Sequence, residues 1–113
     1  MHEMAITTSL VGLIQDEQSA RGFSGVRRVI VEIGKLGHVD PHALRFAFEA
    51  ATLGTALSDA ALEIREIGGA AWCMTCSRTV ALDRRGDGCP DCGQHMLIVD
   101  QGDELRLKEL EVV

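Results

Sequence analysis

Residues 73–92, CMTCSRTVALDRRGDGCPDC, contain all four cysteines of the chain as two C-x2-C pairs separated by twelve residues. Each pair offers two thiolates from one tight turn, and a tetrahedral zinc ion binds four such ligands. The spacer includes the polar stretch 84–88, which lets a short ribbon double back, and Gly93 can adopt a positive φ after the second pair. The sequence therefore predicts one closed four-thiolate site, formed by Cys73, Cys76, Cys89 and Cys92.

Two disulfides and an iron site are the alternative interpretations of the cysteines. A pair of disulfides requires an oxidising compartment, yet the Met1–Met4 start carries an acid where a secretory signal carries Lys or Arg. No apolar run approaches the roughly 20 residues of a membrane span, so we expect a cytoplasmic protein without a membrane segment. A four-thiolate iron site like that of rubredoxin is the other alternative, and the colour of the protein distinguishes iron from zinc. A closed thiolate shell activates no water, so the metal is expected to be structural and the protein not an enzyme.

The composition argues against a nucleic-acid partner. The chain has 113 residues and a formal net charge of −6, with four aromatic side chains in total. A phosphate-backbone footprint needs concentrated positive charge, and single-strand binding needs stacking rings. A zinc-ribbon transcription accessory protein is nevertheless the alternative function. Arg78, Arg84 and Arg85 are the only basic side chains near the cysteines, and salt-sensitive DNA binding would favour that alternative.

Helical and strand periodicities alternate in the first half of the chain. Apolar residues recur at helical spacing over residues 1–19, at Ile6, Leu10, Leu13 and Ile14, with Thr7 on the opposite, polar face. The period becomes two over residues 26–34, which predicts a strand with one buried face. Asp40-Pro41 then matches an N-cap followed by proline at the first helical position, and this helix fades by Gly54.

The remaining segments complete an α+β domain. Residues 62–65 alternate as a strand, and residues 96–99 and 104–107 predict a hairpin around the turn 100–103. We expect a small sheet with two helices packed on one face, interrupted by a four-cysteine zinc-ribbon module. The predicted domains are 1–68 with 97–113, and 69–96.

The first three residues, Met-His-Glu, form a second candidate metal site. The Met1 amine, the backbone nitrogen of His2 and its imidazole can close two fused chelate rings, and Glu3 can supply the next ligand. A planar N,O donor set suits Ni(II) or Cu(II), whereas zinc gains nothing from planarity. Solvated residues ahead of a helix are the alternative interpretation.

Taken together, several features resemble the HypA/HybF family of nickel metallochaperones for [NiFe]-hydrogenase maturation. They are the Met-His-Glu-Met start, the strand ending in Ile33-Gly34, Asp40-Pro41, the paired cysteine motifs and residues 101–107, QGDELRL. The resemblance covers essentially the whole chain. It implies a nickel domain bearing a small zinc domain.

The resemblance also implies particular ligands and partners. It assigns nickel, the transported ion, to His2 and Glu3, with the Met1 amine and Asp40 as further ligands, and zinc to the four cysteines. Some members have a histidine just after a cysteine pair, but here His95 is the only nearby histidine. The implied partners are a HypB-type nickel-handling GTPase and the hydrogenase large-subunit precursor, with urease served in some organisms. We expect a monomer or weak homodimer.

Overall fold

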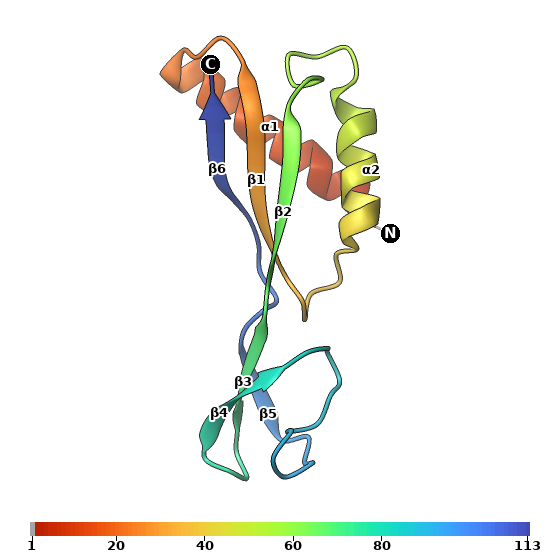
Figure 1. The fold of residues 1–113 in the computed structure, drawn as a ribbon, viewed down its shortest axis with the longest axis vertical. Helices are drawn as coiled ribbons and strands as arrows, with labels where there is room; N and C mark the ends of the chain where they lie inside the picture. The colour runs from red at the N-terminus through yellow and green to blue at the C-terminus, as the bar shows by residue number, and fades with distance from the viewer. Residues whose placement is uncertain (1) are drawn as a thin grey trace. The chain divides into compact units, whose positions relative to one another are not determined.

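The computed structural model describes residues 2–113, which fold into two helices and two small sheets (Figure 1). The elements are α1 Glu3–Arg21, β1 Val26–Gly34, α2 Pro41–Thr52, β2 Ala61–Ile67, β3 Gly69–Cys73, β4 Arg78–Leu82, β5 Leu97–Gln101 and β6 Leu105–Val112. One sheet has the strand order β2-β1-β6 and the other β4-β3-β5. The α+β class is therefore confirmed. Neither helix combines the length and the apolarity that crossing a membrane requires.

Contacts divide the chain into two compact units. The first comprises the chain up to Val31 with residues 39–64 and 107–113, and the second comprises residues 32–38 and 65–106. The sequence predicts domains 1–68 with 97–113, and 69–96, whereas in this division residues 32–38, 65–68 and 97–106 join the cysteine-containing unit.

Helix α1 begins after His2 and ends where Gly22 adopts a left-handed conformation, with φ 75°. Its buried side chains are Glu3, Thr7, Leu10 and Ile14, which follow one helical stripe. The expected stripe was displaced, because Leu13 is 51% exposed and Thr7, assigned to the polar face, is fully buried. The apolar periodicity did not predict this buried face, because two polar residues, Glu3 and Thr7, occupy its first two turns.

Strand β1 has the predicted bounds, but its burial differs from the prediction. From Val29 onward both faces are buried, including Ile30 and Glu32. This follows from its central place between β2 and β6. The Glu32 carboxylate is paired with Nε of Arg106 at 2.5 Å, which offsets part of the free-energy cost of burying its charge.

Helix α2 confirms the predicted start. Asp40 is its N-cap, and the Asp40 side chain accepts hydrogen bonds from the backbone N–H groups of His42 and Ala43. Pro41 occupies the first turn, where its missing N–H leaves no bond unmade. The helix buries Leu44, Ala47, Phe48 and Thr52.

The predicted C-terminal hairpin was wrong. β5 pairs antiparallel with β3 in the second sheet, whereas β6 lies beside β1 in the first. The turn between β5 and β6 exists, and Gly102 adopts φ 102° there, but it connects strands of two sheets. In the second unit, Leu36, Ala71 and Leu82 form a small core to which Leu97 packs, and this packing favours pairing of β5 with β3.

Candidate metal centre

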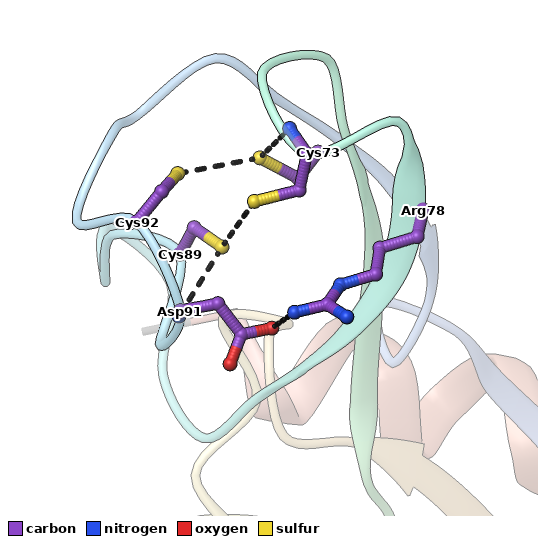
Figure 2. Close-up of polar contacts among 6 residues, drawn as sticks. Cys73, Arg78, Cys89, Asp91 and Cys92 are labelled. Carbon is purple, nitrogen blue, oxygen red and sulfur yellow. Dashed lines mark hydrogen bonds and ion pairs between the residues drawn. The ribbon is translucent and has the colours of Figure 1, made fainter.

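The four cysteine sulfurs lie together in the second unit. All four Sγ atoms are within 4.8 Å of one another, with Cys73–Cys92 at 3.7 Å and Cys76–Cys89 at 3.9 Å (Figure 2). A zinc–sulfur distance of about 2.3 Å gives a regular tetrahedron edges of about 3.8 Å. A disulfide would require about 2.05 Å. The spacing therefore fits four thiolates around one ion rather than two disulfides.

Two matching turns present the sulfurs. After the first pair, the N–H of Ser77 donates to the carbonyl of Cys73 at 2.8 Å, and after the second, the N–H of Gly93 donates to the carbonyl of Cys89 at 2.8 Å. Both closing residues have positive φ, 54° at Ser77 and 76° at Gly93. Gly93 adopts this conformation without a Cβ clash, as the sequence predicted, whereas Ser77 does so as a non-glycine residue.

The packing beneath the turns is apolar. Cys73 and Cys89 are buried with Val80, and Leu97 packs against this cluster. An ion pair between Arg78 and Asp91, which the sequence analysis did not predict, joins the start of β4 to the second cysteine turn (Figure 2). Arg78 lies two residues after the first cysteine pair and Asp91 lies inside the second, so their opposite charges close to the two motifs are the signal that could have revealed this pair.

Hydrogen bonding gives the cysteine thiols different pKa values. The N–H of Cys76 donates to Sγ of Cys73 at 3.4 Å and lowers the pKa of Cys73 to about 7. Contact with the Cys92 thiol is the main cause that raises the pKa of Cys76 to about 12. Four adjacent sulfurs therefore do not all ionise by themselves, and a cation is needed to hold them as thiolates. The donor set fits zinc, and a tetrahedral four-sulfur site also accepts iron.

The N-terminal candidates lie in the first unit. His2 is exposed at the N-cap of α1 and makes no side-chain capping bond. Glu3 is buried in the first turn, and its Oε2 accepts a hydrogen bond from the backbone N–H of Asp40 at 3.3 Å. The structure thus brings Glu3 and Asp40 together, as their joint assignment to nickel by the family resemblance implied, but the contact is made by the Asp40 backbone rather than by its carboxylate.

Met1, proposed from the sequence as an amine ligand, lies outside the described residues. Within residues 2–113, the four cysteines are the one group of three or more His, Cys, Asp or Glu side chains close enough to share an ion. His2, Glu3 and Asp40 do not form such a group there. His95 lies beside Gly88, where its Cε1 would be 3.2 Å from an added Cβ.

The fold and the cysteine cluster define a two-unit α+β metal-binding protein. Residues 1–112 match the family model described as "HypA: Hydrogenase/urease nickel incorporation, metallochaperone, hypA". The chain belongs to this family, which consists of metallochaperones rather than enzymes, and the resemblance inferred from the sequence is confirmed.

Named relatives and solved structures agree with this assignment. The chain is 53% identical over 112 residues to the hydrogenase maturation factor HypA of Rhodopseudomonas palustris (strain TIE-1), covering 99% of each chain. It is 50% identical to that of Azotobacter vinelandii, with the same coverage. A solution structure titled as the Ni metallochaperone HypA from Helicobacter pylori matches with a TM-score of 0.71 and 28% identity, covering 100% of this chain and 98% of that one.

Proposed function

We propose that this chain binds Ni(II) at its N-terminal segment and delivers it for [NiFe]-hydrogenase maturation in the cytoplasm. The proposed ligands are His2 and Glu3, with the Met1 amine and the Asp40 carboxylate as additional donors. The first unit is then the nickel domain. In the second unit we propose that Cys73, Cys76, Cys89 and Cys92 hold one structural Zn(II).

The observation that carries the nickel proposal is the hydrogen-bonded contact between Glu3 and Asp40. These residues are far apart in the sequence, yet the N–H of Asp40 reaches the Glu3 carboxylate. His2 is adjacent in the chain and exposed, so its imidazole is accessible to an incoming ion. Imidazole and carboxylate are donors that nickel accepts. An exposed site also suits transfer, because a partner that offers more or softer ligands can reach the ion directly.

The proposed zinc ion stabilises the second unit and is not transferred to a partner. A four-thiolate shell leaves no open coordination position, so zinc here would activate no water. In small peptides structural zinc contributes on the order of 10–16 kcal/mol to folding. The pair of turns and the small core of the second unit are therefore expected to depend on the ion.

The direct test is an Ni(II) titration of the zinc-loaded protein by calorimetry. The wild type is expected to bind one nickel ion, and His2→Gln is expected to lose that site. His42→Gln is the matched control, because His42 is also an exposed histidine of the first unit and has no place in the proposal. Equal nickel binding by wild type and His2→Gln would contradict the N-terminal site.

Delivery is tested in cells and with purified partners. His2→Gln should abolish [NiFe]-hydrogenase activity while the zinc content and the amide spectrum stay unchanged. We propose a HypB-type GTPase and the hydrogenase large-subunit precursor as partners, and urease as a second recipient. Purified wild type loaded with nickel should lose the ion to such a partner. Retention of hydrogenase activity in the His2→Gln strain would contradict the delivery role.

A further inference from the structure

One face of the β4-β3-β5 sheet carries large apolar side chains that remain exposed. We call it the outer face, and its members are Trp72, Met74, Met96 and Ile98. Trp72 pairs with Ile98 in the β3–β5 register, and the N–H of Met74 donates to the carbonyl of Met96 at 2.9 Å. Because side chains alternate along a strand, Trp72 and its partner Ile98 lie opposite the fully buried Ala71. Met74 directly follows β3 and Met96 directly precedes β5.

The composition of the outer face is that of a recognition surface. Trp72 is 41% exposed and Ile98 55%, and the two methionines are more than half exposed. Tryptophan and methionine are enriched at protein interfaces, and methionine adapts to differently shaped partners. Four side chains cover much less than the roughly 800 Å² per partner of a standard interface. The outer face is therefore suited to a short segment rather than to a broad, stable interface.

Strand β5 offers backbone groups beside this face. It is the terminal strand of the sheet, paired with β3 along one edge, and its stretch Leu97–Gln101 contains no Lys or Pro. Val99, whose side chain belongs to the other face, is also partly exposed. Edge strands bind extended peptides, with main-chain hydrogen bonds providing affinity and side-chain contacts providing specificity.

Two acidic side chains lie near the end of β5, Asp100 within the strand and Asp103 just after it. Asp100 and Asp103 are exposed, and within residues 2–113 neither side chain has an ion pair or a hydrogen bond. A partner with a Lys or Arg at this end would complement them. The β5 strand of a second copy has neither residue, so self-pairing would leave both carboxylates uncompensated. The same charges disfavour nucleic-acid phosphates and anionic lipid.

We propose that the outer face and the free edge of β5 together bind an extended segment of a partner protein. This segment adds to β5 as a further strand, packs alternate apolar side chains beside Met96 and Ile98, and carries a Lys or Arg beside Asp100. The inference rests on the second unit and does not depend on nickel binding by the first.

The test selects short random peptides by display on the zinc-loaded full-length protein and remakes the enriched peptides synthetically. Trp72 is the one tryptophan of the chain, which has no tyrosine, so a blue shift of its emission reports on the outer face. Enriched peptides are expected to alternate apolar and polar residues and to carry Lys or Arg at one end. Ile98→Thr is expected to weaken binding at least about tenfold. Asp100→Asn should weaken it less and reduce its dependence on salt.

Phe46→Ser is the matched control, because Phe46 is 73% exposed but belongs to the first unit; it should bind the peptides like the wild type. Zinc content and amide spectra verify that each variant is folded. The proposal would be overturned by a selection that enriches nothing, or by peptides that bind Ile98→Thr equally well. Dimerisation of the protein that Ile98→Thr abolishes would also overturn it, because the outer face would then bind a second copy. So would a blue shift of the Trp72 emission by phosphatidylglycerol vesicles that bind as tightly as the best peptide.

Discussion

The backbone N–H of Asp40 donates to Oε2 of Glu3 at 3.3 Å, and so connects the start of α1 with the N-cap of α2. Asp40 also uses its Oδ1 to accept from the N–H groups of His42, at 2.9 Å, and Ala43, at 3.4 Å. One residue therefore orients a candidate nickel ligand through its backbone and caps a helix through its side chain. A role for its carboxylate in nickel binding would compete with this capping.

Substitutions at Asp40 separate capping from nickel binding. Asp40→Asn keeps a good N-cap and should change the free energy of unfolding by less than about 0.5 kcal/mol, whereas Asp40→Ala should lose about 1 kcal/mol. If the carboxylate is a ligand, both variants bind nickel more weakly. Urea unfolding and nickel calorimetry measure the two effects. Wild-type nickel affinity in Asp40→Asn would remove Asp40 from the ligand set while leaving its capping role intact.

Removal of the metal should affect the two units differently. The second unit has a small core around Leu36, Ala71 and Leu82, and its two cysteine turns converge on the sulfurs. Chelation is therefore expected to leave residues 73–92 unprotected against amide hydrogen exchange, because structural zinc contributes more free energy than such a core. The first unit has its own buried residues from α1, α2 and β1 and should keep its protection. Persistent protection of residues 73–92 in chelator-treated protein would contradict this expectation.

Local signals in the sequence predicted much of this molecule. The bounds of β1, the Asp40-Pro41 start of α2 and the gathering of the four cysteines all follow from patterns within about twenty residues. The pairing of β5 did not, because the turn at 100–103 is compatible with a hairpin and only the packing of Leu97 against the small core that includes Leu36 decides the partner strand. The family resemblance implied that Glu3 and Asp40 lie near each other as nickel ligands, but the hydrogen bond from the Asp40 backbone to the Glu3 carboxylate was missed, since neither residue carries a local sign of it.

Gly34 and Gly12 provide a matched pair of substitutions. A Cβ on Gly34 would collide with the carbonyl of Gly102 and lie 2.5 Å from the backbone nitrogen of Asp103. Gly34→Ala should therefore destabilise the protein by at least about 2 kcal/mol, because backbone atoms would have to move. Gly12 lies inside α1 with nothing within 4 Å of an added Cβ, so Gly12→Ala should stabilise by about 0.5–1 kcal/mol. Thermal unfolding of both variants checks the contrast, and equal effects would contradict it.

Thr7 is the site of a predicted stabilising substitution. It is fully buried in α1, and its Oγ1 has no hydrogen-bond partner among the described residues. A buried unsatisfied hydroxyl costs about 1–3 kcal/mol, and valine has nearly the same shape without that group. Thr7→Val should therefore raise the free energy of unfolding by about 1 kcal/mol. Thr8→Val is the control, because Thr8 is exposed and bonds to the Met4 carbonyl at 2.9 Å; its effect should stay within about 0.5 kcal/mol. A loss of stability in Thr7→Val would mean that the hydroxyl makes a favourable interaction in solution, and denaturant titration of both variants decides between the two outcomes.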